Sequence, residues 1–209
     1  MLWLNKSSNI DSKDMKRWIK VEPFFPTNGP FQMLNLILDL DSKFKALNRI
    51  LMKQKEGQNY ESIVGTVSKM VDREGQSRDK KLQQICELLA QKVDAFDWVG
   101  FYLVDPEADR ELVLGPYVGE ETDHTRIPFG KGICGQAAET NETFVVQDVS
   151  KEDNYLACSV HVEAEIVVPV KKDGKIVAEL DIDSHTKDSM TEEHRKVLEE
   201  ICEIVSPLF

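Results

Sequence analysis

The sequence predicts an α+β fold in which helices gather on one face of an antiparallel sheet. Two helical patterns, over Tyr60–Val71 and Lys80–Val93, come first, and a third follows Thr191. Between them lie short strand patterns separated by turn residues rather than by further long helices. Strands joined by short turns pair antiparallel, so the helices need cover only one sheet face. The opposite face is then available for function.

The helix patterns consist of apolar residues at three- and four-residue spacing. In Lys80–Val93, for example, Leu82, Ile85 and Leu89 fall on one side of the predicted helix. The last helix is expected to begin after Ser189 or Thr191, because Ser189 and Glu192 match a capping box.

Residues 1–55 are expected to form an N-terminal extension to a domain of residues 56–209. Residues 1–30 are polar and end in a cluster of Pro, Asn and Gly, so we expect a disordered start. From Phe31 to Lys55 apolar residues recur near helical spacing, which predicts a helix. This helix would either pack on the domain or pair with a second copy, which makes a homodimer possible.

Five segments have the pattern of strands: Trp98–Val104, Glu111–Leu114, Thr143–Val149, Glu165–Val170 and Lys175–Asp183. The last two form a hairpin around Asp173-Gly174, a pair that admits more than one turn type. A two-residue turn would place Glu165 opposite Ile182 and mix acids with aliphatic residues. A three-residue loop with a left-handed Gly174 places Glu165 opposite Asp181 and keeps one face apolar, so we expect that register.

In this register the other face carries four carboxylates: Glu165, Glu179, Asp181 and Asp183. Crowding of like charges raises some of their pKa values or calls for a cation. Two interpretations stay open. The acids form either a solvated strand face, or a site that captures an ammonium group and keeps one carboxyl protonated as an acid.

The cysteines fall into two classes. Cys86 and Cys202 lie among aliphatic residues, as buried core cysteines do. Cys134 ends a glycine-rich stretch just before a short helix predicted at Gln136–Glu139, where the helix dipole favours a thiolate. Cys158 lies in a polar connection, so Cys134 and Cys158 are the predicted reactive thiols.

Composition limits the function classes. The net charge of −11 argues against nucleic acid as a partner. The apolar runs are too short to span a membrane, and no signal-peptide pattern precedes them, so a cytoplasmic protein with reduced thiols is expected. No C-x-x-C pair is present, and we expect no metal and no cofactor. A thiol–metal site of His124, Cys134 and Cys158 is a further alternative.

Four linked motifs together resemble the GAF-domain family of free methionine-(R)-sulfoxide reductases. They span Asp97–Leu103, His124–Gly135, Glu165–Pro169 and Leu180–Ser184. The resemblance covers roughly Tyr60 to Phe209. It implies a six-stranded antiparallel sheet with helices packed mainly on one face, and a small pocket for free methionine sulfoxide. It also implies an oxidoreductase that thioredoxin or a similar reductant recycles.

The resemblance also implies roles for particular residues. Cys158 would be the nucleophile and Cys134 a second family cysteine. Trp98 would form a wall against the methyl-sulfinyl group. The residues implied to hold the ammonium group and protonate the sulfoxide oxygen are Asp148, Glu165, Asp181 and Asp183.

The chain departs from the family pattern at His124, ten residues before Cys134, where the family carries a third cysteine. That cysteine usually resolves the sulfenic acid. Here Cys134 or an external thiol would have to do so. Alternatively, the domain is a non-catalytic GAF module that binds a small ligand and signals through its N-terminal region.

Overall fold

The computed structural model describes residues 43–45, 60–156 and 161–209. The chain divides into two compact units, Met1–Met52 and Lys53–Phe209. In the first unit only residues 43–45 are described, and they form a helical turn. The rest of the predicted extension, and Cys158, lie outside the described residues.

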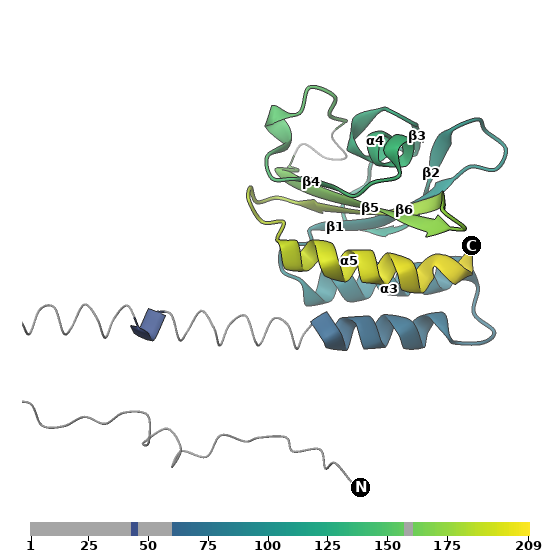
Figure 1. Ribbon diagram of the computed structural model, residues 1–209, viewed down its shortest axis with the longest axis horizontal. Coiled ribbons are helices and arrows are strands. Elements are labelled where there is room, and N and C mark those ends of the chain that lie inside the picture. Colours follow the sequence, from purple (N-terminus) through teal and green to yellow (C-terminus); the bar gives the residue numbers. More distant parts are fainter. Residues whose placement is uncertain (1–42, 46–59, 157–160) are drawn as a thin grey trace, which may run out of the picture. The chain divides into compact units, whose positions relative to one another are not determined.

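A six-stranded sheet with the order β3-β2-β1-β6-β5-β4 forms the centre of the second unit (Figure 1). Its strands are β1 (Trp98–Val104), β2 (Glu111–Val118), β3 (Arg126–Pro128), β4 (Phe144–Val146), β5 (Ala164–Lys172) and β6 (Lys175–Ser184). All neighbouring strands are antiparallel, which confirms the predicted α+β class and the implied sheet.

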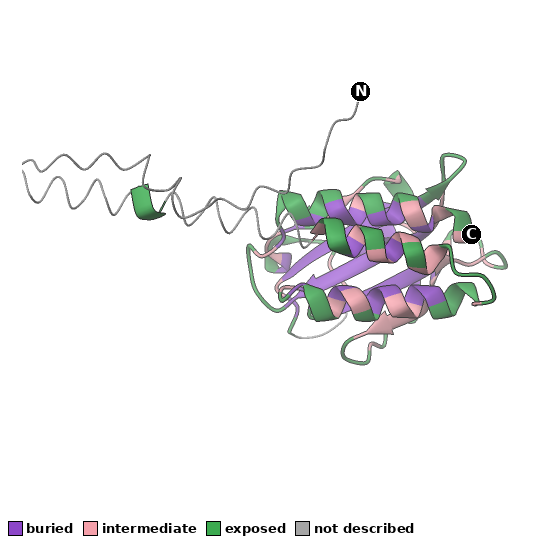
Figure 2. Cartoon of the chain, turned by 90° about the horizontal axis from the view of Figure 1, so that it is seen from below, coloured by how far each residue is buried: buried purple, intermediate pink, exposed green. Residues whose placement is uncertain are grey.

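The helices lie mainly on one face of this sheet, as expected. Of the described helices, three pack there: a helix over residues 60–71, α3 (Arg78–Lys92) and α5 (Glu192–Val205), which is followed by η2 (Ser206–Leu208) (Figure 2). The opposite face carries α4 (Gly132–Thr140) and η1 (Val149–Lys151) (Figure 1).

The helix-covered face holds an apolar core. Strand residues such as Ile166, Leu180 and Ile182 belong to one cluster with helix residues such as Ile85 and Leu198, and all five are fully buried. Because β-strand side chains alternate between faces, every second residue of β5 from Ala164 to Val170 and of β6 from Ala178 to Ile182 contributes to this core.

Side-chain caps set where two of these helices begin. The Ser77 side chain accepts a hydrogen bond from the Lys80 N–H at 3.3 Å and starts α3. At α5, Thr191 accepts from the His194 N–H, while His194 Nδ1 accepts from the Thr191 N–H. The capping box expected from Ser189 is therefore wrong, because the imidazole of His194 completes the box from Thr191.

Two strands differ most in length from their predictions, while β5 and β6 extend theirs by three residues and one residue. β2 continues past Leu114 to Val118, because a bulge near Gly115 and Pro116 lets pairing with β1 resume beyond these two breakers. β4 ends at Val146, because the Asp148 side chain caps η1.

The β5–β6 hairpin corrects the expected register. Its turn has two residues, Asp173 and Gly174, both with positive φ, as in a type I′ turn. A bulge follows, and beyond it Glu165 pairs with Asp183 rather than with Asp181. The expected pairing is wrong by two residues. A shift of two preserves the face of every side chain, so the predicted grouping of the acids is unaffected.

None of the helices in the described ranges is long and apolar enough to cross a membrane.

Candidate active site

Four carboxyl side chains lie together on the sheet face that α3 and α5 do not cover. One comes from β5 and three alternate along β6: Glu165, Glu179, Asp181 and Asp183. Glu165 is 3% exposed and the other three are 0% exposed. The alternative of a solvated strand face is therefore wrong.

Strand β1 supplies the aromatic side of this cluster. Trp98 pairs with Asp183, and Gly100 pairs with Asp181. The indole lies against two glycines: a Cβ on Gly100 would come within 2.2 Å of the ring of Trp98, and one on Gly119 within 2.3 Å. The missing side chains at these positions let Trp98 lie over the sheet next to the acids, and only 3% of it is exposed.

Tyr102, the next β1 residue on this face, is fully buried and pairs with Glu179. Its hydroxyl donates a hydrogen bond to the backbone carbonyl of His124 at 2.8 Å. This bond ties the loop before β3 to the acidic face. His124, the residue that departs from the family pattern, is half-buried in that loop.

Helix α4 brings a thiol to the acids. It begins at Gly132, so it is longer than the predicted Gln136–Glu139, and Cys134 lies in its first turn. The Cys134 Sγ donates to Glu165 Oε1 at 3.8 Å and is almost completely buried. Ligand atoms of Cys134, Glu165 and Asp181 all lie within 4.8 Å of one another. A thiol and at least two carboxyls therefore form one buried group.

The start of α4 is fixed to the segment that precedes residues 157–160. Asn154 Nδ2 donates to the Gly130 carbonyl at 2.8 Å. Gly132 has a φ of +64°, and a Cβ there would lie 3.0 Å from Leu156. The predicted nucleophile Cys158 is two residues after Leu156 in the sequence and belongs to the residues that the structure does not describe.

Burial controls the electrostatics of the acids. It raises the pKa of Asp181 to about 7, while the nearby Cys134 thiol opposes the rise. Burial and the neighbouring acidic charges hold the pKa values of Glu165 and Asp183 well above their usual range, and Glu179 shifts in the same direction. Such carboxyls can keep a proton at neutral pH and deliver it to a bound molecule.

Nothing among the described residues neutralises this cluster. None of their ion pairs involves the four acids. Within the same part of the chain, the Asp183 carboxylate accepts no hydrogen bond, and the neutral Cys134 thiol is the polar group that lies near Glu179 and Asp181. A cationic group or a proton donor is therefore the ligand chemistry that the cluster favours.

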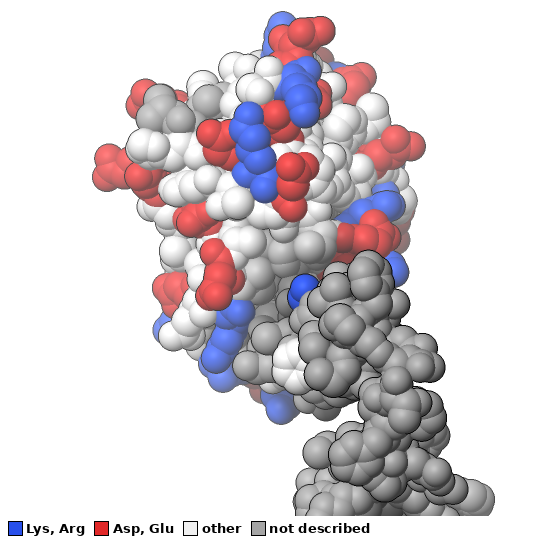
Figure 3. Space-filling view, turned by 90° about the vertical axis from the view of Figure 1, so that its left-hand side faces the viewer, with Lys and Arg blue, Asp and Glu red and all other residues white. Residues whose placement is uncertain are grey.

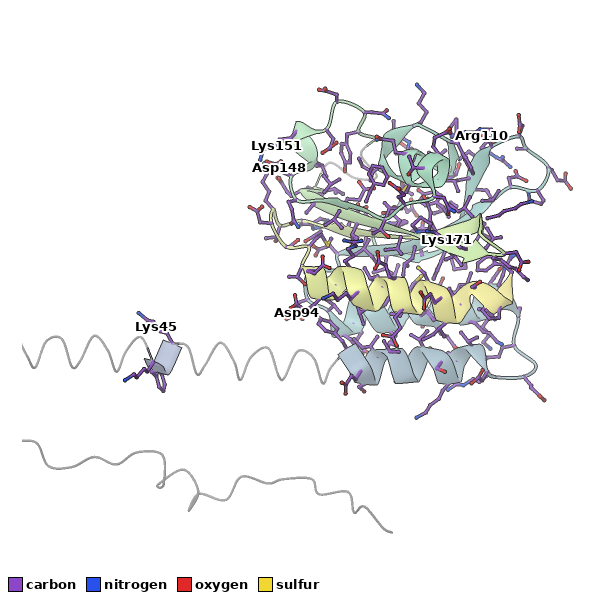
Figure 4. The ribbon with its side chains drawn as sticks, viewed as in Figure 1. Lys45, Asp94, Arg110, Asp148, Lys151 and Lys171 are labelled. Atoms are coloured by element: carbon purple, nitrogen blue, oxygen red, sulfur yellow. The ribbon has the colours of Figure 1, made fainter. Side chains whose placement is uncertain are left out.

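The remaining predicted site residue, Asp148, is in a different environment. Its carboxylate pairs with Lys187 at 2.9 Å and with Lys151 at 3.2 Å, and accepts from Ser150 Oγ at 2.6 Å. These hydrogen bonds, Ser150 first, lower its pKa. Figure 4 shows Asp148 beside Lys151 at one end of the sheet, where basic and acidic side chains intermingle on the surface (Figure 3). The structure thus brings together Trp98, Cys134 and the β5–β6 acids, whereas the Asp148 carboxylate contacts Ser150, Lys151 and Lys187.

Sequence reasoning missed two contributors to this site. Gly100 interrupts an apolar strand pattern, which is a recognised sign of close approach by another group. Tyr102 carried no comparable signal, since a tyrosine in a strand is ordinary. Glu179 was placed on the acidic face but not in the site.

Comparisons with known proteins agree with this geometry. Residues 75–208 match the family model of the GAF domain. GAF domain-containing protein A of Dictyostelium discoideum is 35% identical over 155 residues, which is 74% of this chain and 95% of that protein. The free methionine-R-sulfoxide reductase of Escherichia coli is 36% identical over 114 residues, which is 54% of this chain and 67% of that protein.

A solved structure of the free methionine-R-sulfoxide reductase from Neisseria meningitidis, in complex with its substrate, superposes with a TM-score of 0.67. It is 36% identical, and the match covers 72% of this chain and 87% of that one. The chain therefore belongs to the GAF-domain family, in the group that contains the free methionine-R-sulfoxide reductases.

Proposed function

We propose that this protein reduces free L-methionine-(R)-sulfoxide to methionine. The observation that carries the proposal is the buried cluster of carboxyls beside Cys134 and Trp98. The cluster can donate a proton, and its buried negative charge favours a cationic ligand. Both properties suit an amino acid that carries an ammonium group and a basic sulfoxide oxygen. The named activity of the relatives supports the same assignment.

In the proposed complex, Glu165, Asp181 and Asp183 bind the ammonium group and supply the proton, and Trp98 lies against the methyl-sulfinyl group. Burial makes these contacts stronger than they would be in water. Asp148 is the fourth proposed ligand of the ammonium group. Its ion pairs with Lys187 and Lys151 would have to exchange for that contact.

Cys158 is the proposed nucleophile. Its thiolate attacks the sulfoxide, the protonated carboxyl delivers its proton to the oxygen, and the oxygen passes to Cys158 as methionine leaves. Cys158 is thereby oxidised to a sulfenic acid and the substrate is reduced. The contact of Leu156 with Gly132 supports this role, because it anchors the chain two residues before Cys158 to the helix that carries Cys134.

A second thiol must condense with the sulfenic acid, which releases water and forms a disulfide. Because His124 replaces the usual resolving cysteine, we propose that Cys134 or an external thiol performs this step. Thioredoxin or a similar dithiol then reduces the disulfide.

A thioredoxin-coupled assay with both sulfoxide epimers of free methionine tests the proposal. Wild-type protein should consume the R epimer only, and Cys158→Ser should lose at least about 1,000-fold in kcat/KM. The matched control is Cys202→Ala, because Cys202 is buried on the helix-covered face and should leave turnover unchanged. Turnover that survives in Cys158→Ser would remove the proposed nucleophile.

His124 favours one alternative, a non-catalytic module that binds methionine sulfoxide without reducing it. The two functions differ in a calorimetric titration combined with the assay. Binding of the R epimer without turnover under any thiol reductant would support the binding module. Faster recycling in His124→Cys would support the reductase.

A further inference from the structure

The buried group at the start of α4 has the composition of a metal site. Cys134, Glu165 and Asp181 each present one ligand atom, and these atoms lie within 4.8 Å of one another. The three residues come from different elements, α4, β5 and β6, so they surround a common point rather than follow one strand. All three are buried.

A second observation favours a cation as the ligand of this group. Glu179 and Asp183 flank Asp181 on the same face of β6, and both are fully buried. Within the described residues, neither carboxylate pairs with a base, Asp183 accepts no hydrogen bond, and the polar group near Glu179 is the uncharged Cys134 thiol. Unpartnered buried carboxylates are costly, and a divalent cation would offset much of that cost for the whole group.

The ligand types select the metal. Calcium and magnesium prefer six or more oxygen ligands, which a thiol does not suit. Zinc binds cysteine sulfur and carboxylate oxygen readily, commonly with three protein ligands and one position open to solvent or a small molecule. The alternative set weighed from the sequence, His124 with Cys134 and Cys158, includes a residue outside the described part of the chain. Among the residues that the structure describes, the carboxylate set is the one that the fold assembles.

We propose that Cys134, Glu165 and Asp181 bind a zinc ion reversibly. Binding converts the thiol to a thiolate and releases its proton to solvent, together with any proton held by the two carboxyls. Glu179 and Asp183 add negative charge around the ion without coordinating it. This proposal goes beyond the expectation from the sequence, which is that no metal binds.

Zinc binding has a functional consequence that rests on the proposed function. Glu165 and Asp181 would be ligands of both the zinc ion and the substrate ammonium group, so the two cannot bind together. Zinc would act as a reversible inhibitor that also keeps Cys134 from reacting. Methionine sulfoxide should therefore compete with zinc. Once the sulfoxide concentration exceeds the dissociation constant of the sulfoxide, the apparent dissociation constant for zinc should rise in proportion to that concentration.

The test is a zinc titration of the full chain in competition with a chromophoric chelator. The protein is first stripped of metal, and a phosphine that does not bind zinc keeps its thiols reduced. We expect equimolar binding, weakened at least about 100-fold in Cys134→Ser and in Asp181→Asn. Cys86→Ala is the matched control, because Cys86 is buried in the helix-covered core. Its zinc affinity should equal that of the wild type.

Cobalt(II) provides a readout that a merely unfolded variant cannot imitate. A thiolate-to-cobalt absorption band should appear in the wild type, persist in Asp181→Asn at saturating cobalt, and vanish in Cys134→Ser. Zinc affinity unchanged in both Cys134→Ser and Asp181→Asn would overturn the proposal. So would a band that depends on Cys158 and not on Cys134. Because these measurements need no turnover, their failure is separate from a failure of the proposed reductase activity.

Discussion

The two faces of the sheet are built from the same strands but have opposite chemistry. On the helix-covered face, residues of β5 and β6 such as Ile166 and Ile182 pack against α3 and α5 in an apolar core. On the other face, their neighbours Glu165 and Asp181 are equally buried but carry ionisable groups. One face therefore stabilises the fold. On the other face, burial of the ionisable groups costs free energy, and a bound ligand can offset part of that cost.

The thiols differ in the same way. Cys86 and Cys202 belong to the helix-covered core, and burial raises their thiol pKa values strongly. Cys134 lies in the first turn of α4, in hydrogen-bonding distance of Glu165. Equally buried thiols can thus differ in reactivity, because the reactivity of a thiol also depends on whether a neighbouring group can accept its proton.

The largest expected effect comes from removing one acid of the site while keeping its shape. Asp181→Asn should lower kcat/KM for methionine-(R)-sulfoxide by about 100-fold to 10,000-fold, as loss of a general acid does. Wild-type activity should fall as pH rises above about 7, since Asp181 then loses its proton. The variant should lack this decline. Steady-state rates across pH measure both effects.

The matched control lies in the same hairpin. Asp173 is exposed at the turn and has a positive φ, which asparagine also tolerates. Asp173→Asn should therefore leave the rate and its pH profile unchanged. Equal losses in the two variants would mean that the acidic face has no special role.

The next effect is on stability. The pKa of Asp181 is raised from 3.8 to about 7 in the folded protein, so between these values the native state holds a proton that the unfolded chain releases. The free energy of unfolding should therefore fall as pH rises through this window, by on the order of 4 kcal/mol for this group alone. Glu165, Glu179 and Asp183 shift in the same direction and extend the decline above pH 7.

Urea unfolding from pH 5 to pH 8.5 measures this slope. Asp181→Asn should unfold with a weaker pH dependence and should be more stable than the wild type at pH 8, because it buries no charge. A wild-type protein that gains stability with pH over this range would contradict the buried, protonated acids.

A smaller effect is expected at the glycine beneath the indole. In Gly100→Ala the new Cβ would overlap the ring of Trp98, whose nearest atom lies 2.2 Å away. We expect a loss of about 1–3 kcal/mol in stability from overpacking, and weaker substrate binding, seen as a higher KM. The comparison is Gly65→Ala in the helix over residues 60–71, where nothing lies within 4 Å. That change should stabilise by about 1 kcal/mol and leave KM unchanged.

The two faces were predictable from alternation alone, whereas the register was not. Because side chains repeat every two residues, the grouping of Glu165 with Asp181 held even though its cross-strand partner is Asp183. The sequence at Asp173-Gly174 permits a two-residue turn, but the bulge that restores face matching carries no local signal. It follows from packing on both faces at once.

Burial of the acids was equally beyond sequence reasoning. Glu179 and Asp183 look like exposed strand residues until α4 and its loops are placed over them. The N-terminal half of α4 was also missed, since glycines at 132 and 135 weaken a helix pattern. Gly135 is required there because a Cβ would come within 2.5 Å of the Pro128 carbonyl oxygen.

The smallest expected effect is at the β5–β6 turn, and it distinguishes the contribution of the turn to stability from the contribution of the acidic face to activity. Gly174 has a φ of +76°, and a Cβ at this position would have no neighbour within 4 Å, so Gly174→Ala meets only backbone strain. We expect a loss of about 1–2 kcal/mol in unfolding free energy and no change in kcat/KM, because β1 and the apolar face still hold β6 in register. Urea unfolding and the coupled assay measure the two quantities. The assay is repeated at a lower temperature, where the variant is fully folded. A kcat/KM of Gly174→Ala that is still low there would mean that the turn is needed to position the acids of β6.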